Sequence, residues 1–210
     1  KIAYMRTDIN MDSPEYRYAG LFGVVDGGSI KDVTVTGKLF QNYGNYEKEG
    51  GYDELYVGSG AIAGYLKNGQ ISGCDSYVRT TMDEGGEALY RNSGGIVGIC
   101  SGLVINCTNY GKLSTNILVA QNHVGGIAGL VYGINAQVIN CCNEATVLGY
   151  FCVGGIAGAV KSGGTIESCA NYGTIKGNSI YGGIAGRIST SGVYSNGTAK
   201  QSSIRNVYNV

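Results

Sequence analysis

Residues 153–158 (VGGIAG), followed by residues 165–177 (TIESCANYGTIKG), are the clearest copy of a unit that recurs along the chain. Its short half places glycine on both sides of two apolar residues, and its long half carries Ile, Cys, Asn and Gly at fixed spacing. Further short halves are residues 20–23 (GLFG), 61–64 (AIAG), 95–98 (GIVG), 126–129 (GIAG) and 183–186 (GIAG). Further long halves are residues 104–113 and 138–147, with weaker copies starting at Ile30, Ile71 and Ile204.

The spacing of the short halves predicts stacked coils, since it falls from about 41 residues to about 28 along the chain, a period typical of solenoids. In the long half, Cys169, Asn171, Gly173 and Ile175 alternate with residues of the opposite face, which indicates a β-strand. Ile166 breaks this alternation and predicts a corner just before the strand. We therefore predict an all-β parallel β-solenoid of about six coils, whose stacking buries the apolar face.

The domain boundaries follow from the repeats. Residues 1–18 match no repeat and contain the only proline, so we predict that they form an N-terminal cap over the first strand edges. Residues 19–210 form the solenoid, with repeats starting near residues 19, 60, 94, 125, 154 and 182 and insertions at 40–58, 80–93 and 187–203. The chain starts at Lys1 and stops inside a long half, and we expect both ends to be processing sites or cut points of a longer protein.

Composition excludes several classes of protein. Lys plus Arg and Asp plus Glu number 15 each, so the chain lacks the basic character of a nucleic-acid binder. No apolar run approaches the roughly 18 residues that span a bilayer, so we expect no membrane insertion. The 37 glycines do not fall at every third position, which excludes collagen.

Two columns of repeated residues are expected to be structural. Four of the seven cysteines share one repeat position that Val33 and Val207 occupy elsewhere, which favours a small buried site, although disulfides between coils remain open. These cysteines are Cys74, Cys107, Cys141 and Cys169. A second column carries amides that can bond one another along the axis. Its members are Ser76, Asn109, Asn143, Asn171 and Asn209.

Recognised catalytic patterns are missing from the sequence. The Gly-Gly-Ile-x-Gly element recurs without the spacing of a dinucleotide-binding motif, and a single histidine, His123, cannot build a multi-histidine metal site. We expect His123 to be hydrogen-bonded or solvent-facing. The strand carboxylates fall at four different repeat positions, so they do not pair as glycosidase acids do. They are Asp32, Asp75, Glu144 and Glu167. We predict no catalytic residue, no metal site and no cofactor.

Exposed tyrosines are the candidate binding residues. Tyr77, Tyr110 and Tyr172 share an outward position of the long half, interrupted by Glu144, and suit stacking on sugars or a protein partner. The alternative is that tyrosines simply favour strands and pack along the axis. The first two insertions leave the unit at the same point and should emerge side by side. The first of these insertions adds Tyr43, Tyr46 and Tyr52 to the candidates.

The pattern Gly-Gly-Ile-Ala-Gly, a short turn, and then Ile-x-x-Cys-x-Asn-x-Gly-x-Ile resembles the GLUG-motif repeat of large bacterial surface and secreted proteins. That family includes adhesins and the non-catalytic regions of immunoglobulin-A-cleaving metalloendopeptidases. The resemblance covers about residues 19–210, although this chain carries Cys where many copies carry Ser. It implies a right-handed parallel β-solenoid exported to a bacterial cell surface.

Together these features predict a non-enzymatic adhesion or binding module of a larger surface protein. Its expected partner is a host glycan or an extracellular protein, contacted through the tyrosines and the loop insertions. The first alternative is a passive spacer that holds another domain away from the cell. A polysaccharide-acting enzyme is the less favoured alternative.

Overall fold

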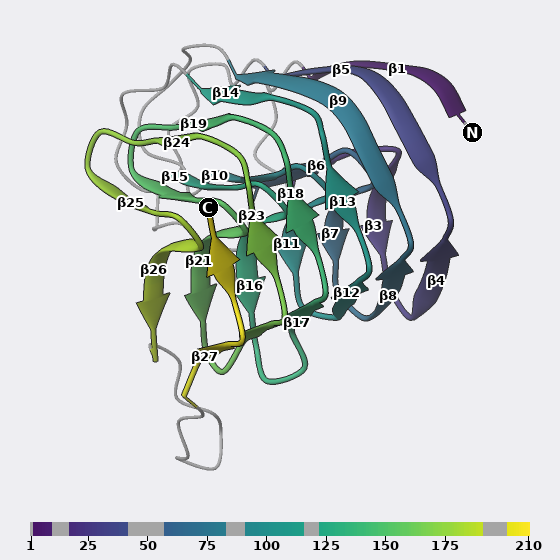
Figure 1. The fold of residues 1–210 in the computed structure, drawn as a ribbon. Coiled ribbons are helices and arrows are strands. Elements are labelled where there is room, and N and C mark those ends of the chain that lie inside the picture. The colour runs from purple at the N-terminus through teal and green to yellow at the C-terminus, as the bar shows by residue number, and fades with distance from the viewer. Residues whose placement is uncertain (1, 10–16, 42–56, 83–90, 116–121, 191–200) are drawn as a thin grey trace, which may run out of the picture.

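A computed structural model describes residues 2–9, 17–41, 57–82, 91–115, 122–190 and 201–210. These residues form strands and turns without any helix, and therefore without a helix that could cross a membrane. The strands pair in parallel into one sheet of 10 strands and three sheets of 6 strands. Matching strands of successive repeats lie side by side in each sheet (Figure 1). The predicted all-β, solenoid-like architecture is therefore confirmed at this level.

The four sheets are defined by their strands. Sheet I contains β2 (Arg17–Ala19), β6 (Val57–Gly60), β10 (Arg91–Gly94), β15 (Asn122–Gly125), β20 (Cys152–Gly154) and β25 (Ile180–Gly182). Sheet II contains β3 (Phe22–Val25), β7 (Ala63–Leu66), β11 (Val97–Cys100), β16 (Ala128–Tyr132), β21 (Ala157–Lys161) and β26 (Ala185–Ser189). Sheet III contains β4 (Gly28–Lys31), β8 (Gly69–Ser72), β12 (Leu103–Ile105), β17 (Gln137–Ile139), β22 (Thr165–Glu167) and β27 (Ser203–Arg205).

Sheet IV has the most strands; Tyr77 lies in it, and Tyr110 and Tyr172 directly follow two of its strands. Its strands are β1 (Ile2–Ile9), β5 (Thr34–Gln41), β9 (Asp75–Met82), β13 (Thr108–Asn109), β14 (Leu113–Thr115), β18 (Cys142–Asn143), β19 (Val147–Leu148), β23 (Ala170–Asn171), β24 (Ile175–Lys176) and β28 (Tyr208–Asn209). The long β9 pairs with both β13 and β14, because later coils divide the same path into two short strands. Within the predicted cap, β1 pairs in parallel with β5.

The core is built from columns of equivalent residues. Ile71, Val104, Val138 and Ile166 pair in register across sheet III and are fully buried. Burying apolar surface contributes about 25 cal/mol per Å2, and no coil could do this alone. A smaller apolar cluster joins sheet I to the second half of sheet IV. It consists of Val57, Met82, Leu113, Val124, Val147 and Val153, with Ile175 packed against it.

The corner predicted before each long-half strand is confirmed. A residue with positive φ stands immediately before every Cys or Val of the cysteine column, as at Asn106 (φ 55°) before Cys107 and Asn140 (φ 49°) before Cys141. Asparagine tolerates the left-handed region better than most residues. The same position holds Gly73 (φ 61°) before Cys74. These turns reset the face that each strand presents to the core.

The cysteine column is structural, as predicted. Cys74, Cys107, Cys141 and Cys169 are at most 2% exposed, and all seven cysteines of the chain are free thiols. Each of the four points its Sγ at the carbonyl two residues earlier, for example Cys107 at Ile105 O (3.3 Å). Burial thus explains why this position accepts Cys or Val.

The predicted amide column forms a continuous hydrogen-bonded ladder. Asn109 Nδ2 donates to Asn143 Oδ1 (2.9 Å), Asn143 Nδ2 to Asn171 Oδ1 (2.8 Å), and Asn171 Nδ2 to Asn209 Oδ1 (2.8 Å). Each of the first three also donates to the carbonyl two residues later, as Asn143 does to Ala145 O (2.8 Å). These side chains are at most 1% exposed except at Asn209, so the ladder satisfies polar groups that the core would otherwise leave unpaired.

Both ends of the segment predicted as insertion 80–93 lie in strands. Residues 80–82 belong to β9 and residues 91–93 to β10, and most of them are buried. Asn92 and Ser93 are polar and fully buried, and Ser93 Oγ lies 2.8 Å from Ser59 Oγ in the neighbouring strand. The polar composition of these strand residues explains why the sequence pattern resembles a loop.

Candidate functional site

The tyrosine column, which we define as Tyr77, Tyr110, Glu144 and Tyr172, follows the outward face of sheet IV. Tyr77 lies in β9, and the other members directly follow β13, β18 and β23. Each backbone N–H donates to the preceding coil, as Tyr110 N does to Ser76 O (2.8 Å) and Tyr172 N does to Asn143 O (2.8 Å). The tyrosine side chains are 44–52% exposed, so a partner in solution can reach them.

The structure brings two of these tyrosines together and separates the third. The rings of Tyr77 and Tyr110 stack with centroids 4.7 Å apart and planes 12° apart. Glu144 occupies the next position, so Tyr172 lies two coils beyond Tyr110, with Glu144 between them. Desolvation is the main cause that raises the pKa of Tyr110 above its ordinary value. The charges of ionised Tyr77 and of Asp75 act in the same direction. Tyr77 and Tyr110 therefore form a two-ring stack on the outward face of sheet IV.

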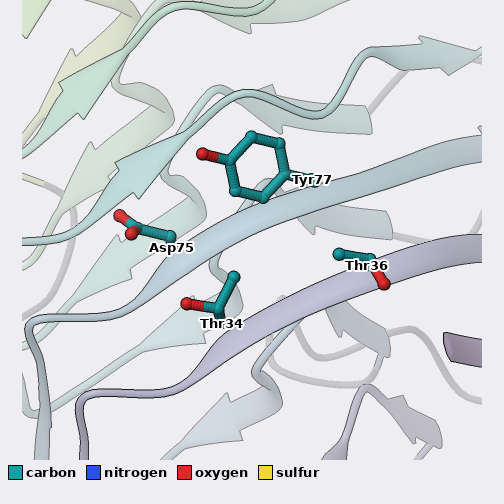
Figure 2. A pocket seen from close by; sticks show the side chains of 4 residues that line it. All are labelled: Thr34, Thr36, Asp75 and Tyr77. Atoms are coloured by element: carbon teal, nitrogen blue, oxygen red, sulfur yellow. The ribbon is translucent and has the colours of Figure 1, made fainter. Parts of the chain in front are cut away.

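Beside Tyr77 lies a shallow hollow of about 390 Å3, lined by Thr34, Thr36, Asp75 and Tyr77. Figure 2 shows the two threonines on β5 and the other two side chains on β9. Thr36 pairs in register with Tyr77, so the column changes from an aromatic ring to a short side chain at this step. Tyr110 stacks on one face of the Tyr77 ring, and Tyr77 also lines the hollow.

The hollow combines an apolar wall with polar groups at its edge. Thr34 and Thr36 carry hydroxyl groups that both donate and accept hydrogen bonds, and the Asp75 carboxylate accepts them. Desolvation is the main cause that raises the pKa of Asp75. The volume of the hollow lies at the lower end of the range of ligand pockets, about 300–1,000 Å3. This arrangement can hold a small ligand that is apolar on one face and rich in hydroxyls at its rim.

The other candidate residues are distributed differently. Tyr43, Tyr46 and Tyr52 lie outside the described residues. Glu167 forms an ion pair with Arg205 (2.9 Å), and Asp32 occupies a corner with positive φ. Across the described ranges, no group of three or more His, Cys, Asp or Glu side chains could hold a metal ion.

The hollow was not predicted from the sequence, although the sequence contains a signal for it. Extending the tyrosine column by one coil towards the N-terminus places Thr36 beside Tyr77. Replacement of a ring by a short side chain at the end of an aromatic column leaves less of the last ring covered by its neighbour in the column. The register between two weakly similar repeats was needed to find it.

His123 is buried and hydrogen-bonded in sheet I, which confirms the first of its two expected environments. Its Nδ1 lies 2.8 Å from Asn92 Oδ1, and the side chain is 1% exposed. Desolvation, with the positive charges of Lys161 and Arg187, lowers the pKa of His123 to about 3. The imidazole is therefore neutral in the folded protein at pH 7.

We expect stability to fall as the pH falls from about 6.5 towards 3. The unfolded chain binds a proton at His123 below pH 6.5 whereas the folded chain does not, so this residue contributes a slope of up to about 1.4 kcal/mol per pH unit. The measurement is urea unfolding across this range for the wild type and His123→Asn. Carboxylates titrate in both proteins, so a wild-type slope no steeper than that of the variant would contradict the expectation.

Comparison with models of known protein families finds no match, and comparisons with curated proteins and with solved structures find none either. The GLUG-like resemblance therefore stays a prediction from the repeat pattern. Function has to be argued from the surface of the molecule itself.

Proposed function

We propose that this chain is a non-enzymatic carbohydrate-binding module that holds a saccharide in the hollow beside Tyr77. The observation that carries the proposal is the hollow that the half-exposed Tyr77 ring lines together with Thr34, Thr36 and Asp75. The proposal includes a right-handed solenoid of six coils capped by residues 1–18. It also places the module at a bacterial cell surface within a larger protein, as the repeat resemblance implies.

The chemistry of a sugar ring matches that of the hollow. A pyranose presents C–H groups on its faces and hydroxyls around its edge. The faces pack on an aromatic ring, whose electron-rich surface attracts the slightly positive C–H groups. The hydroxyls then donate to the Asp75 carboxylate and exchange hydrogen bonds with the threonines. Tyr110 stacks on the Tyr77 ring and supports its orientation beside the hollow.

The test of this proposal is the loss of saccharide binding in Tyr77→Ala. We expect at least a tenfold loss, because aromatic contacts contribute about 0.5–1.5 kcal/mol beyond the area that they bury. The matched control is Tyr172→Ala, which removes a tyrosine of the same column, 52% exposed, away from the hollow. The measurement is a glycan array of neutral and acidic saccharides, followed by titration of the strongest ligand with each protein.

Two results would contradict the proposal. One is an array without a reproducible ligand, and the other is a ligand that Tyr77→Ala binds as tightly as the wild type. Thermal unfolding of both variants within about 2 °C of the wild type shows that the folded state is intact.

A passive spacer is the second candidate, and the amide ladder favours it. Asn109, Asn143 and Asn171 link successive coils by hydrogen bonds inside the core, which stiffens the stack along its axis. A spacer needs no particular residue on its outward face, so Tyr77→Ala and Tyr172→Ala would then behave alike in every binding assay. An extracellular protein as the ligand would be detected by an extracellular-matrix array instead.

A further inference from the structure

Three cations stand in a row on the outward face of sheet IV. Lys38 pairs in register with Arg79, and the pairing of Leu113 with Thr80 places Lys112 beside Arg79 on its other side. All three side chains are exposed and alternate with buried residues, so they share the face of the tyrosine column. We call Lys38, Arg79 and Lys112 the cation row.

The fold does not explain the cation row. Neighbouring strands lie about 4.8 Å apart, and like charges directly opposite one another destabilise a sheet. The ion pairs between described side chains are Lys67–Asp26 and Arg205–Glu167, so no described carboxylate neutralises the row. Within the described residues, the three cations thus repel one another at a cost to stability that an anionic ligand would offset.

Two members of the cation row lie on the strands that line the hollow. Lys38 and Arg79 lie on β5 and β9, the strands that line the hollow, two residues after Thr36 and Tyr77. The equivalent position in the next two coils holds Thr146 and Thr174. Asp75 lies two residues before Tyr77, so the ring is flanked by an acceptor on one side and by cations on the other.

We propose that the hollow and the cation row form one site for an acidic saccharide, a sugar that carries a carboxylate or a sulfate. This inference rests on the proposed function and names the class of sugar. The ring stacks on Tyr77, its hydroxyls face Thr34, Thr36 and Asp75, and its acidic group lies on Arg79 and Lys38. Arginine suits this role because its planar fork donates two parallel hydrogen bonds to a carboxylate.

A nucleic acid is the competing polyanion, since bases also stack on tyrosine. The saccharide is favoured because the Asp75 carboxylate and two threonines line the hollow beside Tyr77, where they accept hydrogen bonds from sugar hydroxyls. The chain also has equal numbers of positive and negative side chains, so it lacks the excess of positive charge that is typical of nucleic-acid binders. Single-stranded DNA is therefore a comparison in the test.

The test compares polygalacturonate with its methyl ester, which keeps the sugar rings and removes the charge. We expect the wild type to bind polygalacturonate at least tenfold more tightly than the ester, with an affinity that falls as salt is added. Lys38→Gln/Arg79→Gln should lose this preference and still bind the ester. The control Lys31→Gln/Lys176→Gln removes the same charge at exposed positions away from the hollow and should keep the preference. The same comparison of affinities between dextran sulfate and dextran tests whether a sulfate is the preferred acidic group.

Each outcome decides the proposal. A preference for the charged member of either pair that Lys38→Gln/Arg79→Gln abolishes supports it, and the pair that responds identifies the acidic group. Equal, Tyr77-dependent binding of charged and neutral members overturns the acidic site and leaves the proposed function standing. Binding of oligothymidylate as tight as that of polygalacturonate overturns it in favour of a general polyanion surface. The absence of Tyr77-dependent binding to every saccharide overturns both proposals.

Discussion

Gly158→Ala is expected to destabilise the chain by about 3 kcal/mol or more, or to prevent folding altogether. A Cβ at Gly158 would meet the backbone N of Val124, and it would lie 2.6 Å from the His123 carbonyl carbon and 2.7 Å from Gly129 O. All three atoms belong to the backbone of packed strands, so none can rotate away. Overpacking in a dense core costs about 1–3 kcal/mol when side chains can adjust, and more when they cannot. The measurement is urea unfolding of the wild type and the variant.

The first coil provides a matched control. Gly23 occupies the same position of the short half, but among the described residues a Cβ there meets only Tyr18 O, at the ordinary contact distance of 3.4 Å. Gly23→Ala should therefore unfold within about 1 kcal/mol of the wild type, since no backbone atom has to move. Equal unfolding midpoints for Gly158→Ala and Gly23→Ala would show that the coils do not approach one another as closely as described.

Asn143→Ala is expected to cost about 3 kcal/mol, which lowers the melting temperature by about 6–12 °C in a domain of this size. Removing this amide deletes the bonds to Asn109, Asn171 and Ala145 in one step. It takes one of two bonds from Asn109 Nδ2, which keeps Gly111 O, and one of two from Asn171 Oδ1, which keeps Gly173 N, in a core that water does not reach. A buried polar group that loses its partner carries its full desolvation penalty.

The control for Asn143→Ala is Asn209→Ala at the exposed end of the ladder. Asn209 accepts a single ladder bond, from Asn171 Nδ2, so we expect a loss of about 1 kcal/mol. Differential scanning calorimetry compares the two variants with the wild type. A larger loss at Asn209 than at Asn143 would contradict a ladder whose contribution comes from burial.

The structural columns were predictable from the sequence because each coil repeats the same physical constraint. Cys107 and Cys141 replace Val at a small buried site, and Asn109 and Asn143 occupy a position where only an amide can bond both its neighbours. Such positions keep their residue type from coil to coil. The corner before each cysteine was predictable for the same reason. The Ile three residues before the Cys and the Cys itself must both face the core, and strict alternation does not allow this without a turn between them.

The strand boundaries and the hollow were not predictable in this way. Asn92 and Ser93 are polar residues in a buried strand, and they are tolerated because His123 and Ser59 lie in hydrogen-bonding register with them. Those partners are 31 and 34 residues away in the sequence, so no local pattern reveals them. The hollow likewise depends on Thr36 standing beside Tyr77, which only the register between coils establishes.

The most direct test of saccharide binding beside Tyr77 is an NMR titration of protein labelled with 13C in its tyrosine rings. Tyr77→Phe and Tyr110→Phe assign the two resonances, and trigalacturonate is the ligand. We predict saturable shifts of the Tyr77 and Tyr110 rings, with the exposed rings of Tyr172 and Tyr181 unchanged. Saturable binding that leaves the Tyr77 and Tyr110 resonances in place, or their constancy up to millimolar ligand, would contradict the proposed site.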